Sequence, residues 1–231
     1  MLSAEWAQAG TLICQVVEEA RRDPVKARQH LMEQSLKLVG GDFVCMVFQQ
    51  GEQLKLGASY GMSPDEVKRW RDWYDYREDP MAQAFLRRQL GLWACSRPML
   101  VDDSTWSRSS HVNEGWRAFG LNEGAVSSVA LGPQVEGFFS ITRRWGTPPF
   151  GLDQIKLLQL LHHATAWLDR RDWREAQLAP RLQSVYRQLL GEASEKEIAT
   201  RLGLSVRTVH KYTEQIYRQL AVRSRAELMA M

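Results

Sequence analysis

The spacing of apolar residues in the first part of the chain predicts helices followed by strands. Residues 3–21 and 24–39 place apolar side chains every three to four positions, which is typical of helices with one buried side. Pro24 stands at the expected first position of the second helix. Two apolar runs between glycines, 42–48 and 54–60, predict a buried strand and its hairpin partner.

The same pattern continues through the middle of the chain. We expect helices over 63–74, 80–89 and 112–119, and strands over 91–95, 125–131 and 137–142. The polar stretch 97–111 predicts no regular element, and 152–171 predicts one long helix. About five strands with helices before, between and after them indicate an α+β fold. The expected architecture is an α/β/α sandwich around an antiparallel sheet, a plan similar to GAF- and PAS-like sensory domains.

Near the C-terminus the pattern predicts two short helices joined by a tight turn. Ile198, Ala199 and Leu202 form the apolar stripe of the first helix. Gly203 can adopt the left-handed conformation that ends it, and Ser205 can cap the next helix. The expected apolar positions of that second helix are Val206, Val209, Ile216 and Leu220. A short helix, a tight turn and a helix with a basic outer face indicate an all-α helix-turn-helix reader of the major groove.

Composition and charge indicate that the chain consists of two different parts. Hydrophobic residues make up 44% of the 231 positions and charged residues 25%, which favours a folded protein with a real core. The whole chain has 30 Lys or Arg against 27 Asp or Glu. Residues 179–231 hold nine of these basic and five of these acidic residues. The positive excess therefore lies in the C-terminal segment, as nucleic-acid binding requires.

The cysteines and the terminal sequence favour a cytoplasmic protein. Cys14, Cys45 and Cys95 are odd in number and lack metal-ligand or CxxC spacing, so we expect reduced, buried thiols. No run of about 18 apolar residues predicts a membrane span. The N-terminus lacks the basic start and apolar block of a signal peptide.

Residues 178–231 closely resemble the LuxR-type helix-turn-helix module. The matching segments are Leu178-Ala-Pro180-Arg181, Lys196-Glu197-Ile198-Ala199, Ser205-Val-Arg-Thr208-Val209 and Leu220-Ala-Val222-Arg-Ser224-Arg225-Ala-Glu227-Leu228. The chain departs from the family pattern at Leu182 and Gln183, which replace an acidic pair, and at Ala221, which replaces a glycine. The resemblance implies binding to double-stranded DNA, commonly as a homodimer that pairs two recognition helices.

Roles for the second helix follow from its exposed side chains. We expect His210, Lys211 and Glu214 to face base edges, since Lys can bind guanine and Glu can accept from cytosine. A second group is better placed for phosphates: Arg207, Thr208, Tyr212 and Arg218. The last predicted helix, 224–231, either contributes a dimer contact or closes the core of the module.

The region 70–145 is similar to the autoinducer-binding domains found in front of such modules. The resemblance rests on Trp70 and Tyr74, on Asp79-Pro80, on Trp93 and on Phe119-Gly-Leu121-Asn-Glu-Gly124. It implies a pocket for an acyl-homoserine lactone in which Asp79 accepts from the ligand amide and the aromatic residues reach its carbonyls. The ligand residues implied are Trp70, Tyr74, Asp79 and Trp93.

Each of these residues also has a purely structural interpretation. Any single aromatic residue can be an ordinary part of the core, and Asp79 can cap the helix that begins at Pro80. If side chains fill the pocket, the domain is a ligand-independent dimerisation or protein-interaction module. A phosphoreceiver domain is excluded because the strands and helices do not alternate as its parallel sheet requires.

No catalytic, metal or cofactor motif competes with a regulatory function. His162 and His163 are adjacent, so they point in different directions and form no i, i+4 metal pair. No glycine-rich phosphate loop or nucleophile elbow occurs. We therefore predict a non-enzymatic, cytoplasmic transcription regulator with a sensory domain over 1–171, a connection over 172–179 and a DNA-binding domain over 180–231.

Overall fold

The computed structural model describes residues 4–230, with the exception of 52, 88–93, 133–134 and 192. Its contacts divide the chain into two compact units, Met1–Asp169 and Arg170–Met231. Most of the stretch expected to connect two domains is helical, because α8 (Ala166–Gln177) runs through it.

The N-terminal unit is built on a five-stranded antiparallel sheet in the order β2-β1-β5-β4-β3. Its strands are β1 (Phe43–Gln50), β2 (Gln53–Tyr60), β3 (Ala94–Ser96), β4 (Leu121–Gly132) and β5 (Val135–Arg144). β1 and β5 meet in the centre, where Phe43 is opposite Thr142 and Gln49 is opposite Glu136. Successive side chains point to opposite faces, so each strand contributes to two cores.

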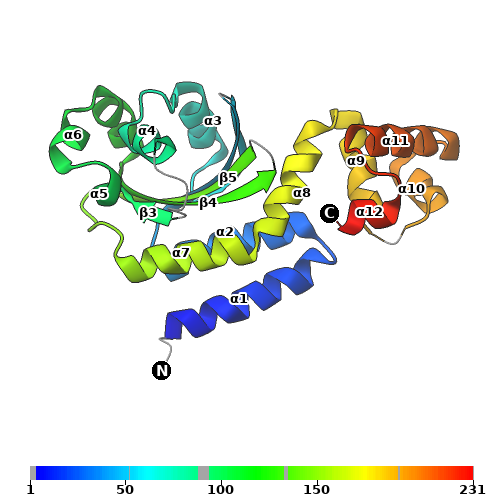
Figure 1. Cartoon of the computed structure of the whole chain (residues 1–231), viewed down its shortest axis with the longest axis horizontal. Coiled ribbons are helices and arrows are strands. Elements are labelled where there is room, and N and C mark those ends of the chain that lie inside the picture. Colours follow the sequence, from blue (N-terminus) through cyan, green and yellow to red (C-terminus); the bar gives the residue numbers. More distant parts are fainter. Residues whose placement is uncertain (1–3, 52, 88–93, 133–134, 192, 231) are drawn as a thin grey trace. The chain divides into compact units, whose positions relative to one another are not determined.

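Helices cover both faces of this sheet (Figure 1). On one face lie α2 (Pro24–Val39) and α7 (Leu152–Ala164), with α1 (Ala4–Ala20) packed on their outer side. The other face carries α3 (Pro64–Trp73), α4 (Pro80–Leu86), α5 (Arg97–Leu100) and α6 (Asp103–Arg108). The predicted α/β/α sandwich is confirmed.

Two predicted elements in the middle of the chain differ from the structure. The stretch 97–111, expected to be irregular, contains α5 and α6. Asp102 caps α6 by accepting a hydrogen bond from the Thr105 amide at 2.9 Å, so a polar sequence forms a helix without an apolar stripe. The predicted helix over 112–119 is a π-helical turn, Val112–Trp116, followed by a 3₁₀ turn, Arg117–Phe119.

The single helix expected over 152–171 is two helices, α7 and α8, divided at Thr165. The Thr165 hydroxyl donates to the carbonyl of Leu161 at 2.6 Å, and its backbone has left the helical region at φ −112° and ψ 10°. A threonine bonded back to the preceding turn bends a helix. Apolar spacing continues across Thr165, so it did not predict this break.

A buried polar network ties the end of this unit to its sheet. Arg28 on α2 pairs with Asp169 on α8 at 2.5 Å, and both side chains are almost fully buried. The other Asp169 oxygen contacts His162 Nε2 at 2.8 Å, while His162 Nδ1 contacts the Ser127 hydroxyl on β4 at 3.0 Å. Burial alone would raise the pKa of Asp169, but the charge of Arg28 and the bond to His162 outweigh it and lower that pKa.

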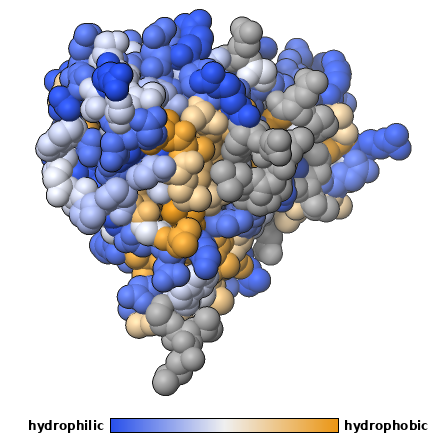
Figure 2. Space-filling view, turned by 60° about the vertical axis from the view of Figure 1, so that its left-hand side comes forward, coloured by the Kyte–Doolittle hydropathy of each residue, from blue (hydrophilic) through white to orange (hydrophobic). Residues whose placement is uncertain are grey.

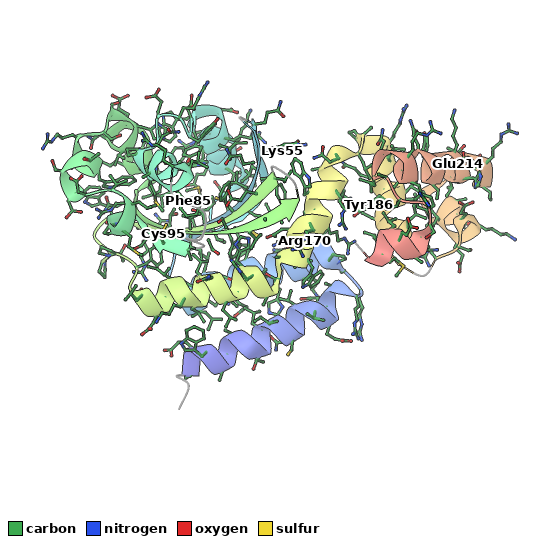
Figure 3. The ribbon with its side chains drawn as sticks, in the orientation of Figure 1. Lys55, Phe85, Cys95, Arg170, Tyr186 and Glu214 are labelled. Carbon is green, nitrogen blue, oxygen red and sulfur yellow. The ribbon has the colours of Figure 1, made fainter. Side chains whose placement is uncertain are left out.

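The C-terminal unit is a small bundle of short helices. They are α9 (Pro180–Leu189), α10 (Glu195–Leu202), α11 (Val206–Gln219) and α12 (Arg225–Ala230). Its buried core is apolar and includes Leu182 and Ile216. Tyr186 of α9 belongs to the same core (Figure 3). Arg225 donates to the carbonyl oxygens of Leu189 and Ala193, at 2.8 and 2.7 Å, and so satisfies the end of α9.

The last helix closes the core of its own unit, which is one of the two roles predicted for it: Leu228 is 2% exposed, whereas Met229 is exposed. Val206, placed on the apolar side of the second helix, is 48% exposed because it begins the helix where no neighbouring helix covers it. Cys14, expected to be buried, is also exposed.

The face of the molecule in Figure 2 is largely polar. Figure 2 shows hydrophilic side chains over most of one face, with a narrower strip of hydrophobic ones between them. Large hydrophobic residues exposed in the N-terminal unit are Val17, Val25, Met99, Trp145 and Leu152. Scattered exposure of this kind is common in folded proteins.

Candidate functional site

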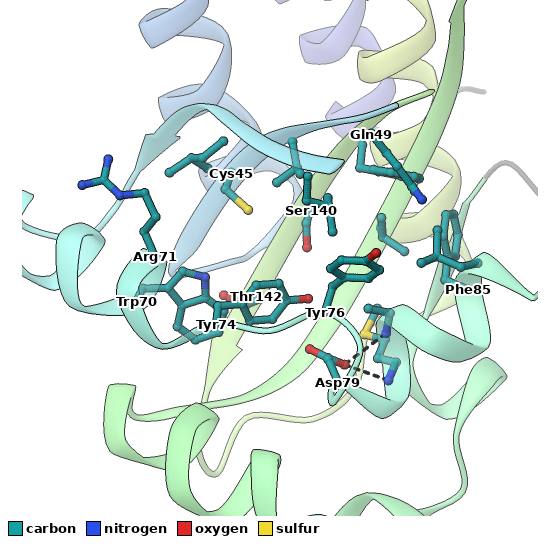
Figure 4. Close-up of a pocket in the computed structure, with 18 of the residues that line it drawn as sticks. Cys45, Gln49, Trp70, Arg71, Tyr74, Tyr76, Asp79, Phe85, Ser140 and Thr142 are labelled. Atoms are coloured by element: carbon teal, nitrogen blue, oxygen red, sulfur yellow. Dashed lines mark hydrogen bonds between the residues drawn. The ribbon is translucent and has the colours of Figure 1, made fainter. Parts of the chain in front are cut away.

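The N-terminal unit contains a cavity of about 220 Å³ between its sheet and helices α3 and α4 (Figure 4). Its lining is predominantly apolar, with a small number of polar side chains. Residues that line it include Phe43, Cys45, Val47, Gln49, Leu54, Leu56, Trp70, Arg71, Tyr74, Tyr76, Asp79, Phe85, Trp116, Phe138, Ser140 and Thr142. Apolar walls with a few polar groups are typical of small-molecule sites.

Local structure explains why these side chains meet. Odd-numbered positions of β1 and even-numbered positions of β5 point to the same face, which brings Cys45 opposite Ser140. Helix α3 begins with a reciprocal cap: the Glu66 amide donates to the Ser63 hydroxyl at 3.3 Å, and the Ser63 amide donates to the Glu66 carboxylate at 2.9 Å. This fixed start directs Trp70, one turn later, toward the cavity.

Aromatic rings form one wall of the cavity. Trp70 stacks on Tyr74 with ring centres 5.1 Å apart and an interplanar angle of 16°. Trp116 and Phe119 pack against Trp70 in T-shaped arrangements, with ring centres 5.9 and 5.1 Å from that of Trp70. The sequence-based candidates Trp70, Tyr74 and Asp79 therefore lie together, whereas Trp93 lies outside the described residues.

Asp79 is both a helix cap and a wall of the cavity. One carboxylate oxygen accepts from the amides of Met81 and Ala82, at 2.8 and 3.0 Å. The other accepts from Trp116 Nε1 at 3.0 Å. Burial raises the pKa of Asp79, and these hydrogen bonds oppose the rise. The capping interpretation is thus seen directly, and the same carboxylate still borders the cavity.

The remaining ionisable groups of the cavity favour a neutral interior. Burial, followed by the nearby charge of Asp79, raises the pKa of Tyr74 well above its ordinary value. Burial likewise raises the pKa of Cys45 to about 12. The Tyr74 hydroxyl and the Cys45 thiol are both neutral at physiological pH. They can form hydrogen bonds with a ligand, and neither offers a positive charge to an anionic one. Arg71 carries the only guanidinium in the lining, and its side chain is exposed.

Several lining residues could not be found from the sequence. Cys45, Gln49, Ser140 and Thr142 lie on strands that come together only through the antiparallel pairing of β1 with β5. Their alternation with residues of the opposite face marks them as facing one side, but it does not say that a cavity lies there.

The second candidate site is the pair of helices α10 and α11. Ser194 and Glu197 form a reciprocal cap at the start of α10, and Gly203 ends it with φ +64°. Ser205 then caps α11 by accepting from the Thr208 amide at 3.0 Å. The Gly203 stop and the Ser205 cap were predicted from the sequence, whereas the reciprocal cap of Ser194 and Glu197 was not.

The candidate DNA-contacting residues occupy α11 in two groups. Arg207, His210, Lys211, Glu214 and Arg218 are exposed. Thr208 and Tyr212 are partly buried: the Thr208 hydroxyl bonds to that of Ser205 at 2.8 Å, and Tyr212 packs against the core of the unit.

Two carboxylates flank His210 on this surface. Its Nδ1 lies 3.2 Å from the Glu195 carboxylate at the start of α10, and its Nε2 lies 3.6 Å from Glu214. Glu195 was not among the sequence-based candidates, because it belongs to the preceding helix. The hydrogen bond to Glu195 and the nearby Glu214 carboxylate place His210 between two acidic groups on the exposed side of α11.

Two searches of the described residues bear on other functions. No cluster of three or more His, Cys, Asp or Glu side chains in this part of the chain has an arrangement that could hold a metal ion. Within the same residues, every helix is too short or too polar to span a membrane.

Comparisons with known proteins agree with the two-unit architecture. Residues 176–231 match the family of bacterial regulatory proteins of the luxR type, so this segment is a LuxR-family helix-turn-helix domain. The crystal structure of SdiA from Escherichia coli is similar over 97% of this chain and 95% of that chain, with a TM-score of 0.53 and 17% identity. A search of curated protein sequences gives no match.

Two further structures share the fold. SdiA in complex with octanoyl-rac-glycerol is similar over 99% of this chain and 94% of that chain, with a TM-score of 0.50 and 16% identity. CepR2 from Burkholderia cenocepacia, described as an N-acylhomoserine lactone dependent LuxR family transcription factor, matches 71% of this chain and 98% of its own, with a TM-score of 0.52 and 14% identity. The chain therefore has the architecture of LuxR-type regulators with a GAF-like N-terminal domain.

Proposed function

We propose that this chain, whose residues 176–231 form a LuxR-family helix-turn-helix domain, is a cytoplasmic transcription regulator controlled by a small molecule. The observation that carries the proposal is the cavity of about 220 Å³, which has apolar walls and a few polar groups. A ligand that binds one arrangement of the two units better than another shifts the population toward that arrangement. No step of this function requires an enzyme or a cofactor.

The DNA-binding part of the proposal rests on α11. His210, Lys211 and Glu214 read base edges in the major groove, and Arg207, Thr208, Tyr212 and Arg218 contact phosphates. The exposure of five of these residues supports the assignment. The proposed binding partner is double-stranded DNA. A homodimer presents two such helices to the two halves of a near-palindromic site.

The effector is a small neutral amphiphile, and an acyl-homoserine lactone-type quorum-sensing signal is the leading candidate. Trp70, Tyr74 and Asp79 supply polar contacts for its head, and Trp93 is proposed as a fourth contact. The predominantly apolar lining supports a ligand without net charge. The dependence of CepR2 on N-acylhomoserine lactone and the octanoyl-glycerol complex of SdiA support the same class of ligand.

The alternative is a ligand-independent regulator whose N-terminal unit serves dimerisation or protein interaction. A cavity filled by side chains would have favoured it, and the open cavity favours the sensor instead. A thermal-shift screen of acyl-homoserine lactones and acylglycerols against the full chain separates the two. We expect a rise in the unfolding temperature with at least one of them. No shift with any compound would favour the interaction module.

The DNA assignment is tested by a matched pair of variants and a selected operator. Lys211→Ala should weaken binding by about tenfold at particular base pairs and relax the preference there, because a base contact is lost. Arg218→Ala should weaken binding to all sequences and reduce the slope of affinity against salt concentration, because a phosphate contact is lost. Unchanged affinity in both variants would show that α11 does not read the DNA.

A further inference from the structure

Gln49 places an amide at one end of the cavity. It lies near the end of β1, opposite Leu54 on β2. In Figure 4 Phe85 lies on the same side, and the hydroxyl of Tyr76 points toward that side. Trp70 and Arg71 lie at the other side of the cavity, away from Gln49 and Phe85 (Figure 4). A pocket for a plain alkyl tail needs no amide at this place.

The orientation of the Gln49 amide is fixed by the backbone. Its Nε2 donates to the carbonyl oxygen of Gly51 at 2.9 Å. Turning the amide over would bring two carbonyl oxygens together, so the nitrogen must point to Gly51. The Oε1 atom is left buried without a hydrogen-bond partner among the described residues. An unpaired buried acceptor is costly, so the site gains from a donor that arrives with a ligand.

A second unpaired polar atom lies toward the other end. Thr142 is 4% exposed, and its Oγ1 has no partner among the residues that the structure describes. Thr142 is opposite Phe43 in the sheet, six positions along β1 from Gln49. At about 3.3 Å per residue, the two backbone positions are about 20 Å apart. The cavity therefore presents an unpaired polar atom near each end, and Cys45 and Ser140 lie between them.

From this arrangement we infer that the effector is polar at both ends: a neutral amphiphile whose apolar part terminates in a hydrogen-bond donor, such as a hydroxyl or an amide N–H, that binds Gln49 Oε1. A charged ammonium would be disfavoured, since burial beside Leu54, Phe85 and Leu86 costs a charge far more than it costs a neutral donor. The inference rests on the proposed sensing function and adds the chemistry of the distal end of the ligand.

Matched probes test this inference on the full-length chain. Each of three ω-hydroxyacyl-homoserine lactones, with six, seven or eight acyl carbons, is compared with its unsubstituted acyl counterpart by calorimetric titration. The same pairs are prepared as acylglycerols, so the result does not depend on one head group. At the chain length that reaches Gln49, the hydroxylated probe should bind wild-type protein about tenfold more tightly than its counterpart.

Variants connect this preference to one atom. Gln49→Leu should remove the preference for the hydroxyl or reverse it, because the acceptor is replaced by an apolar group of similar size. Gln50→Leu is the control, since Gln50 is the adjacent, exposed residue on the opposite side of β1 and should keep the preference. Equal binding of hydroxylated and plain probes, or an unchanged preference in Gln49→Leu, would overturn the inference and leave the sensing function intact. Failure of every probe to bind the wild-type chain would overturn both.

Discussion

The two units of this protein handle polar groups in opposite ways. The N-terminal unit buries Arg28, Arg97, Glu123 and Asp169, and it leaves a cavity beside its sheet. The described part of the C-terminal unit buries one polar side chain, Thr213, whose hydroxyl bonds to the Val209 carbonyl one turn away. One unit is held by contacts between distant parts of the sequence, and the other by an apolar core closed with local caps.

This difference follows from what each unit must do. A solid core with capped helices keeps α10 and α11 at a fixed angle, which a reader of the major groove needs. A pocket must instead give up core volume, and packing that is lost there has to be replaced elsewhere. Buried ion pairs fix relative positions of elements although they add little net stability. Removing one partner of such a pair is therefore the most direct test of this difference between the two units.

The largest effect is expected for Arg28→Met. The change leaves the Asp169 carboxylate buried without its 2.5 Å partner, which should cost about 3–5 kcal/mol in the free energy of unfolding. Urea unfolding followed by tryptophan fluorescence reports this unit almost alone, because residues 174–231 contain no tryptophan. Lys37→Met is the control: Lys37 pairs with Glu33 at the surface, and its loss should leave the urea midpoint unchanged.

The same ion pair predicts a dependence on pH. The pKa of Asp169 is lower in the folded protein than its ordinary value of about 3.8. Its contribution to stability is therefore fully present above about pH 4 and is lost as the pH falls through the folded-state pKa. Urea midpoints measured from pH 7 down to pH 3 should fall at the acidic end in wild-type protein. If Arg28→Met declines no differently from wild type there, the pair does not carry this dependence.

The next largest effect is expected for Gly115→Ala. A Cβ at this position would lie 1.6 Å from Cζ2 of Trp73, whose ring stacks on His111 at 4.2 Å and cannot easily move. We expect a loss of about 1–3 kcal/mol in the free energy of unfolding, from overpacking. The control is Gly10→Ala on α1, where nothing lies within 4 Å and the change should stabilise the helix by about 0.5–1 kcal/mol. Equal behaviour of the two variants would contradict the packing of Trp73.

The contrast between the units also explains what the sequence could predict. In α10 and α11 the determinants are local: Gly203 and Ser205 act within four residues, so the turn and the cap of α11 were readable in advance. In the N-terminal unit the strands were predicted from apolar runs between turn residues, and the capping role of Asp79 was recognised. The break at Thr165 and the buried partner of Arg28 were not, because they depend on side chains or neighbours that apolar spacing does not encode.

The cavity shows the same limit on what the sequence can predict. Trp70, Tyr74 and Asp79 could be proposed from the resemblance of residues 70–145 to autoinducer-binding domains, and the structure brings them together. Gln49 and Thr142 could not, since their significance lies in unpaired atoms that appear only when β1 pairs with β5. Whether a polar residue is satisfied is a property of the whole fold.

The smallest effects are expected at the two left-handed residues that end α10 and α11. Gly203 has φ +64° and Ala221 has φ +55°, so an alanine holds a conformation that favours glycine. Ala221→Gly should raise the free energy of unfolding of the C-terminal unit by about 0.5–1 kcal/mol, because relief of left-handed strain of about 1–2 kcal/mol exceeds the added entropy of the unfolded chain.

Gly203→Ala is the reverse experiment and should lower that free energy by about 1 kcal/mol. Nothing lies within 4 Å of the added Cβ, so backbone strain is the sole cost. Tryptophan fluorescence does not report residues 178–231, and amide hydrogen exchange over α10 and α11 measures both variants instead. Changes of opposite sign in the unfolding free energy of the two variants would show that stability in this unit follows from single backbone conformations. A neutral Ala221→Gly would mean that residue 221 does not hold the left-handed conformation in solution.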